Sequence, residues 1–294
     1  MLVLRFFGEE KQNCHRRNME EKKKRNKSHA ALLALILLLG AANGKRLLDR
    51  NSHLKKYAEM PTVEAAAPSS SAETTAAAES TAAAAAAPVQ DPDAERVIDF
   101  AALKAKNPDV VGWIYVPGTV VNYPILHREA DNEYYLRRDI DGREGSYDGV
   151  FLDGDDAADF SKLQNLIYGH HMKNGTMFTP LISFKRKSFF EEHTRVYLYT
   201  PEHTYILKPL ASLYTDAGED KRRIDFSDRR EFNAYVDQMT KGCEFRDLPA
   251  EGIDKLFSFV TCSYEFSDAR TILYCYEVDA AGNPVKPTPL GSGL

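Results

Sequence analysis

The stretch Phe257–Arg270 reads FSFVTCSYEFSDAR, and the fold can be worked out from it. An apolar, strand-like run, Lys255–Cys262, ends at the cysteine, and a second such run, Thr271–Val278, follows after a short connection. Consecutive antiparallel strands joined by so short a link have their facing ends side by side. We therefore expect Cys262 and Arg270 to share one end of a sheet, where the cation would favour the reactive thiolate. On these residues alone, a buried structural cysteine beside a surface arginine remains the alternative.

A second informative segment, Asn165–Phe178, reads NLIYGHHMKNGTMF. An apolar strand runs into Gly169, which is expected to let the chain turn so that the His170 ring lies over a neighbouring site. Two solvated turn histidines, His170 and His171, are the alternative. A metal site is not expected, because no carboxylate or third histidine stands at a familiar ligand spacing.

The remainder of the globular region is rich in short strands, which predicts a mainly β fold built as a closed or nearly closed barrel. One helix is predicted within Glu95–Asp109, stopped by Asn107-Pro108, and another over Ser227–Lys241, with Ser227 as N-cap and Gly242 as the C-terminal stop. The other expected strands are Val110–Val116, Val120–Leu126, Gly149–Asp153, Asn165–Tyr168, Thr194–Thr200, Thr204–Leu210 and Ala211–Thr215.

The charge of the chain is divided unevenly along its 294 residues. Met1–Lys56 holds 14 basic and 5 acidic side chains, a net charge of +9, and because the whole chain carries −5, the rest carries −14. A basic head on an acidic body does not fit a nucleic-acid binder, whose basic surface should lie within the folded domain. It fits a chain whose start lies against anionic lipid.

The apolar run Ala30–Ala42 follows the basic start, and we interpret it as an uncleaved membrane anchor. A cleaved signal peptide and a buried helix are the alternatives. We expect a cytoplasmic segment over 1–29, the anchor over 30–44 and a membrane-flanking segment and disordered linker, rich in Ala, Ser, Thr and Pro, over 45–93. A catalytic domain outside the membrane would span 94–280, and a flexible tail 281–294.

The four cysteines do not form a zinc-finger pattern or a dense disulfide framework. Side chains alternate along a strand, so if Arg270 faces the site, Cys275 faces away from it. A Cys262–Cys275 disulfide is unexpected for the same reason. Cys243, just past a helix stop, is interpreted as a packing residue, and Cys14 would remain inside the cell.

Taken together, these segments resemble the sortase family, and its class B branch most closely. The TLxTC motif of that family stands here as Ser258-Phe259-Val260-Thr261-Cys262, with Arg270 at the arginine position. Tyr168–Met172 is similar to the histidine motif, Asn107–Leu126 to the first two class B strands, and Ser227–Lys241 to the additional helix of the branch. Ser258 and Phe259 depart from the usual Thr-Leu, and His171 stands where many members have Asn.

The resemblance implies an eight-stranded barrel with flanking helices and a cysteine transpeptidase that needs no cofactor. Cys262 would be the nucleophile, His170 the general acid and base, and Arg270 the stabiliser of the oxyanion. Thr261, Ser263, Tyr264, Glu265 and His171 are expected to support the site or contact substrate. For Glu265 and Asp268 the two interpretations are a solvated side chain, which is favoured, and a carboxylate that orients Arg270 or contacts substrate. The implied partners are surface proteins with a sorting signal, NPxTx-like in some members, and an amine of a peptidoglycan precursor or a pilin.

Two other functions fit the same residues. An extracellular cysteine endopeptidase would use water as acceptor in place of the amine. A non-catalytic, wall-associated binding module would hold Cys262 as a structural thiol. Product analysis with an added amine separates the first from a transpeptidase, and thiol labelling with and without denaturant separates the second.

Overall fold

Eight strands close into a barrel in the computed structural model, which describes residues 42–60, 62–63, 91, 93–145, 149–216, 218, 221–262 and 269–288. Around the barrel the strand order is β10-β8-β7-β3-β4-β5-β6-β9. The mainly β, closed-barrel prediction is confirmed. The strands are β3 (Val110–Tyr115), β4 (Asn122–Leu126), β5 (Val150–Leu152), β6 (Gln164–Gly169), β7 (Val196–Tyr199), β8 (Thr204–Thr215), β9 (Leu256–Cys262) and β10 (Arg270–Val278).

Two strand pairs are parallel, β4 with β5 and β6 with β9, and the other pairs are antiparallel. The two runs expected at Thr204–Leu210 and Ala211–Thr215 form the single strand β8. Its register against β10 shifts between Tyr274 and Cys275, so Leu210 is the extra residue of a bulge. A bulge continues a strand while bending it, which is why the sequence looks interrupted there.

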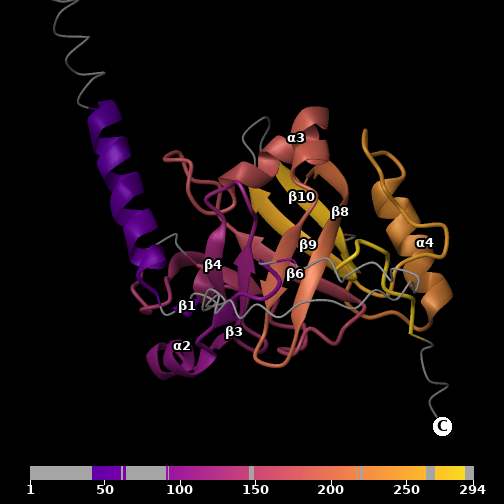
Figure 1. Cartoon of the computed structure of the whole chain (residues 1–294), viewed down its shortest axis with the longest axis horizontal. Helices are drawn as coiled ribbons and strands as arrows, with labels where there is room; N and C mark the ends of the chain where they lie inside the picture. The colour runs from indigo at the N-terminus through magenta and orange to yellow at the C-terminus, as the bar shows by residue number, and fades with distance from the viewer. Residues whose placement is uncertain are drawn as a thin grey trace, which may run out of the picture. The chain divides into compact units, whose positions relative to one another are not determined.

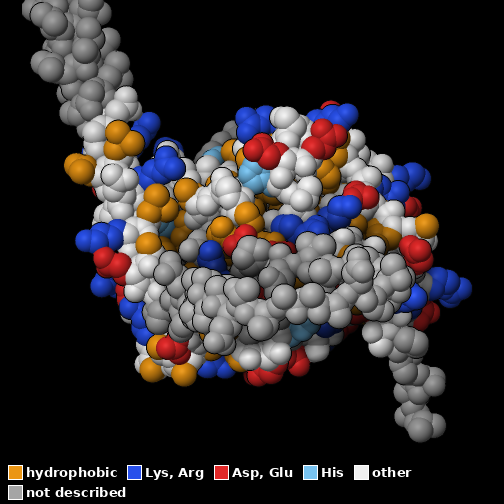
Figure 2. Space-filling model, in the orientation of Figure 1, with side chains coloured by type: hydrophobic (Ala, Val, Ile, Leu, Met, Phe, Trp, Pro, Cys, Tyr) orange, Lys and Arg blue, Asp and Glu red, His pale blue; other side chains and the backbone are white. Residues whose placement is uncertain are grey.

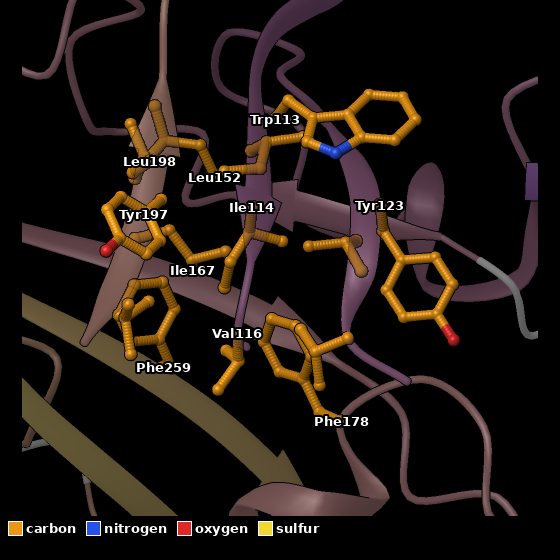
Figure 3. Close-up of a cluster of buried hydrophobic side chains, with 14 of the residues drawn as sticks. Trp113, Ile114, Val116, Tyr123, Leu152, Ile167, Phe178, Tyr197, Leu198 and Phe259 are labelled. Atoms are coloured by element: carbon orange, nitrogen blue, oxygen red, sulfur yellow. The ribbon is translucent and has the colours of Figure 1, made fainter. Parts of the chain in front are cut away.

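The barrel interior is filled by alternating side chains from the strands, as expected from the two-residue period of a strand. Ile114 and Val116 of β3 and its end, Ile167 of β6 and Phe259 of β9 meet there and are almost completely buried (Figure 3). Phe259 packs edge to face against Phe178, with ring centroids 6.2 Å apart. The exchange of Leu for Phe within the motif therefore affects the packing of the core.

A second core lies on the outside of the barrel, beneath α4 (Arg229–Thr240), as Figure 1 shows beside β8, β9 and β10. Phe232, Tyr235 and Val236 form the apolar stripe of this helix and pack on outward-facing side chains of the sheet. The cap differs from the prediction. Asp228 accepts the Glu231 backbone N–H at 2.7 Å, while Ser227 donates its own backbone N–H and hydroxyl to the Glu231 carboxylate.

The first predicted helix starts later than expected, but it ends at the predicted Asn107-Pro108 stop. Val97–Ile98 forms strand β2, which pairs with β1 (Thr62–Val63), and helix α2 occupies only Phe100–Lys106. Asp99 caps α2 by accepting the Ala102 N–H at 2.9 Å, which fixes the start of the helix. Three further helical segments were not predicted: η1 (Tyr135–Arg137), η2 (Thr179–Lys185) and α3 (Lys187–Glu192).

Residues 42–58 form a helix, although they were expected to belong to the anchor's end and the linker. The chain divides into two compact units, Met1–Ser52 and His53–Leu294. In the second unit His53, Tyr57 and Met60 are buried, although the sequence placed them in the membrane-flanking segment and linker. In the first, Leu47 and Leu48 are exposed, and Figure 2 shows apolar and basic side chains along this helix.

The expected anchor over 30–44 lies almost entirely outside the described residues. Among those that are described, no helix is both long and apolar enough to span a bilayer. The tail expected to be flexible begins with fixed contacts, since the Thr288 N–H donates to Asp254 at 2.6 Å and the Thr288 carbonyl accepts from Arg229 at 2.8 Å.

Candidate active site

A pocket of about 290 Å³ opens where three neighbouring strands, β6, β9 and β10, reach the same edge of the barrel. It brings together the three residues that the sequence singled out, His170, Cys262 and Arg270. Its lining residues are Asn132, Leu136, Phe151, Tyr168, Gly169, His170, Arg222, Val260, Thr261, Cys262 and Arg270.

The register of the three strands explains this convergence. Cys262 and Arg270 are direct partners across the antiparallel pair β9–β10, so their side chains leave the sheet on the same face. Tyr168 is level with Val260 across the parallel pair β6–β9. His170 comes two residues after Tyr168 and Cys262 two residues after Val260, so both follow this last pair at the same edge of the sheet as Arg270.

His170 follows directly on β6, and the residues around it hold both its backbone and its ring. Its Nε2 atom lies 2.7 Å from the Leu136 carbonyl oxygen. A carbonyl only accepts, so Nε2 carries a proton in this arrangement, and Nδ1 is the nitrogen that can gain or release one. The His170 carbonyl accepts the Phe178 N–H at 3.0 Å, which closes the loop after the strand.

Gly169 serves the site in a way that differs from the prediction. Its backbone does not adopt a positive φ, and it is the last residue of β6. A Cβ atom at this position would lie 2.6 Å from the ring of Phe178. Glycine is therefore needed for the close approach of that ring, rather than for a turn, and the packed ring supports the strand end that carries His170.

A buried carboxylate, Asp153, holds three of the pocket-lining side chains in place. It is completely buried and accepts from Arg222 Nε and Nη2, both at 2.7 Å, in a bidentate pair. It also accepts from the Tyr168 hydroxyl at 2.8 Å and from Asn132 Nδ2 at 3.1 Å. Burial alone would raise the pKa of Asp153, but these donors, with Arg222 foremost, hold that pKa below its ordinary value.

Two further cysteines are separated from this pocket. Cys275 is buried in the barrel interior, opposite Phe257, and burial raises the pKa of its thiol well above the ordinary value. It faces away from Arg270, as the alternation predicted. Cys243 is half-buried, and burial raises its pKa too. Cys243, Cys262 and Cys275 are all free thiols.

The expected supporting residues have different outcomes. Thr261 lines the pocket, whereas His171, which forms an isolated bridge with Met177, does not. Ser263, Tyr264 and Glu265 lie outside the described residues. No group of three or more metal-ligating side chains occurs within the described ranges.

Sequence reasoning missed four pocket residues, Asn132, Leu136, Phe151 and Arg222, of which Phe151 lies on β5. Asn132 and Leu136 come from the segment between β4 and β5, and Arg222 precedes α4. None belongs to a local motif, and only closure of the barrel brings them into the pocket that His170, Cys262 and Arg270 line. The one available signal was the group of acidic residues after β5, Asp153, Asp155 and Asp156, which indicates a nearby cation without identifying it.

No family model matches the sequence. The chain is 25% identical over 170 residues to sortase B of Staphylococcus aureus, covering 58% of this chain and 69% of that protein. It is 26% identical over 164 residues to sortase B of Listeria monocytogenes, covering 55% of this chain and 66% of that protein.

Solved structures give the same result for the fold. Clostridium perfringens sortase B matches with a TM-score of 0.58 at 25% identity, over 62% of this chain and all of that one. A sortase B-like protein of Bacillus anthracis matches with a TM-score of 0.56 at 27% identity, over 62% of this chain and 83% of that one. The matches in sequence and in fold agree, and together they support a class B sortase family for this chain.

Proposed function

We propose that this chain is a cysteine transpeptidase that cleaves a peptide sorting signal and transfers the new acyl end to an amine. The observation that carries the proposal is a single pocket lined by a thiol, an imidazole and a guanidinium, at the edge of the barrel where β6, β9 and β10 meet. Each group has a defined part in acyl transfer, and the supported family contains enzymes of this kind.

The thiolate of Cys262 attacks the carbonyl carbon of the scissile peptide bond and forms a tetrahedral oxyanion. Protonated at both nitrogens, His170 gives its Nδ1 proton to the departing amine as the C–N bond breaks, leaving a thioester on Cys262. The incoming amine then loses a proton to Nδ1 and attacks the thioester. The thiolate leaves, a new amide forms, and the enzyme returns to its starting state.

Arg270 contributes through its charge and its fork of N–H donors. It is the direct strand partner of Cys262, where a cation favours the thiolate over the thiol. The same donors can hydrogen-bond the oxyanion of the tetrahedral intermediate. Loss of one such donor commonly costs about 3–4 kcal/mol of transition-state stabilisation.

For the substrates, we propose a surface protein with a sorting signal as acyl donor and a peptidoglycan precursor or pilin amine as acceptor. A sortase B of the same fold has been solved in complex with triglycine, and that of S. aureus as a substrate complex, which suggests oligoglycine as a first acceptor to test. In this proposal the barrel lies outside the membrane, with the basic N-terminus facing anionic lipid.

The test uses the full chain, a library of quenched peptides that includes NPxTx-type sequences, and triglycine as acceptor. A transpeptidase gives a peptide–triglycine product whose yield rises with triglycine, and Cys262→Ala gives none. Hydrolysis alone, unchanged by any added amine, would instead assign an endopeptidase. A Cys262 thiol that reacts with a labelling reagent only after denaturation, with no cleavage in the library, would favour the binding module.

A further inference from the structure

The end of the N-terminal helix is built into the barrel core. Tyr57 and Met60 are buried members of the main hydrophobic cluster, and His53 is buried beside them. The Tyr57 ring meets the ring of Tyr123, on β4, edge to face, with centroids 5.0 Å apart, and His53 packs against both rings. This helix end therefore touches the strand that carries Tyr123.

Tyr123 in turn supports the loop that follows β6. Its hydroxyl accepts the backbone N–H of Met177 at 3.0 Å in a buried hydrogen bond. Met177 has a positive φ of 55°, a conformation that a residue with a side chain keeps only when its surroundings impose it. The next residue, Phe178, donates its N–H to the His170 carbonyl. One chain of contacts thus runs from Tyr57 to the backbone of His170.

Lys56, the neighbour of Tyr57, begins a second chain of contacts that ends on the His170 ring. Its Nζ atom lies 2.7 Å from Asp139 Oδ2 and 3.3 Å from Asp141. Asp139 is buried, and its other oxygen accepts the backbone N–H groups of Asp141 and Arg143 at 3.0 Å each. This fixed turn follows closely on η1, whose Leu136 carbonyl accepts from His170 Nε2.

We propose that Lys56 and Tyr57, which do not line the pocket, are positioning residues for His170 and reach it through two separate chains of contacts. The inference rests on the proposed function for its kinetic consequence, but its structural part is independent of it. Lys56 acts through η1 on the ring acceptor, and Tyr57 acts through Tyr123 on the backbone of the histidine loop. A segment next to the expected membrane anchor is thereby part of the catalytic support.

Hydrogen bonds that do not involve Lys56 also hold η1 and the residues after it in place. The Tyr135 hydroxyl donates to Asp109 at 2.6 Å, and Asn107 donates to the Ile140 carbonyl at 2.9 Å. Removal of Lys56 alone should therefore displace His170 slightly rather than release it. A displacement of about 1 Å in a catalytic group can cost on the order of 100-fold in rate, so a partial one should cost about tenfold in kcat.

The experiment compares the full chain with Lys56→Met, Tyr57→Ala and Tyr123→Phe. Lys55→Met is the matched control, because it removes the same charge from the same helix. Among the described residues, Lys55 pairs only with the exposed Glu59, at 3.6 Å. Lys56→Arg tests rescue by a retained cation. Hydrogen exchange at the amides of Met177 and Phe178 is measured with thermal unfolding, and kcat and KM with an active NPxTx-type peptide and triglycine.

The proposal predicts faster exchange at Met177 in Tyr57→Ala and Tyr123→Phe, by about tenfold or more. It also predicts kcat about tenfold lower in all three variants, with KM unchanged and with Lys55→Met and Lys56→Arg close to wild type. Unchanged exchange, unchanged kcat, or a loss of activity that merely follows the unfolded fraction would overturn it. An inactive wild type would refute the proposed function alone, while the exchange data would still decide the positioning role of Tyr57.

Discussion

The ion pair between Asp153 and the pocket-lining Arg222 allows a quantitative prediction of how much one contact contributes to the free energy of unfolding. Asp153 has no solvent exposure, whereas the Arg222 side chain is 41% exposed. The perturbation is Arg222→Gln, which removes the cation and the bidentate fork but keeps a polar side chain. Asp153→Asn and the double variant complete a double-mutant cycle.

Removing one partner of a buried ion pair typically costs about 3–5 kcal/mol, because a charge is left buried without compensation. Two features of this pair reduce that figure. Arg222 is partly solvated, and Asp153 keeps hydrogen bonds from Asn132 and Tyr168 after the substitution. We therefore expect Arg222→Gln to lower the free energy of unfolding by roughly 2–3 kcal/mol, with a coupling energy of about 2 kcal/mol between the two positions.

Urea denaturation of the four proteins at neutral pH measures this coupling. Arg223→Gln is the matched control, since Arg223 is the adjacent residue and pairs with Glu231 on the surface, where an ion pair contributes little to stability. The pKa of Asp153 is lower in the folded protein than in the unfolded chain, so ionised Asp153 stabilises the fold at pH values above the unfolded pKa. That contribution is lost as the pH falls through the folded pKa. A coupling energy below about 0.5 kcal/mol would refute the reasoning.

Three further predictions concern single residues. Arg270→Lys should lower kcat by on the order of 100-fold with the fold intact, because an ammonium does not reproduce the planar fork; steady-state kinetics and a thermal melt check this. Burial raises the pKa of Asp156 to about 7, so stability should fall as the pH rises from about 4 to about 7, by up to roughly 4 kcal/mol; denaturation across this range should show a flatter dependence in Asp156→Asn. Gly169→Ala should destabilise the fold by about 1–3 kcal/mol, because the new Cβ meets the Phe178 ring at 2.6 Å; an unchanged melting temperature would contradict that packing argument.

The strands were predictable because each carries its own signal. β9 and β10 are runs of β-branched and aromatic residues that end at a polar connection, and this pattern alone placed Cys262 beside Arg270. The parallel neighbour relation of β6 and β9 has no such local signal, since parallel strands are joined by long crossovers. The residues alone therefore suggested a site at His170. Only the closed barrel shows that His170 lines the same pocket as Cys262 and Arg270.

Other features depended on tertiary contacts that the sequence does not reveal. The end of the N-terminal helix looked like polar linker, yet Tyr57 and His53 are buried because Tyr123 offers an aromatic surface to them. Gly169 looked like a turn residue, yet its lack of a side chain serves the Phe178 ring. Arg222 carried no motif at all, because its role depends on a buried carboxylate 69 positions earlier in the chain.

The central claim is that the Cys262 sulfur, assisted by His170 and Arg270, forms the covalent intermediate. Intact-mass spectrometry of the full chain mixed with a cleavable sorting-signal peptide tests it most directly. We predict an acyl adduct on Cys262 that is released by hydroxylamine and converted by triglycine into transfer product. Neither the Cys262→Ala variant nor the His170→Ala variant should accumulate this adduct. Turnover by Cys262→Ala, or an adduct that maps to Cys243 or Cys275, would contradict the account.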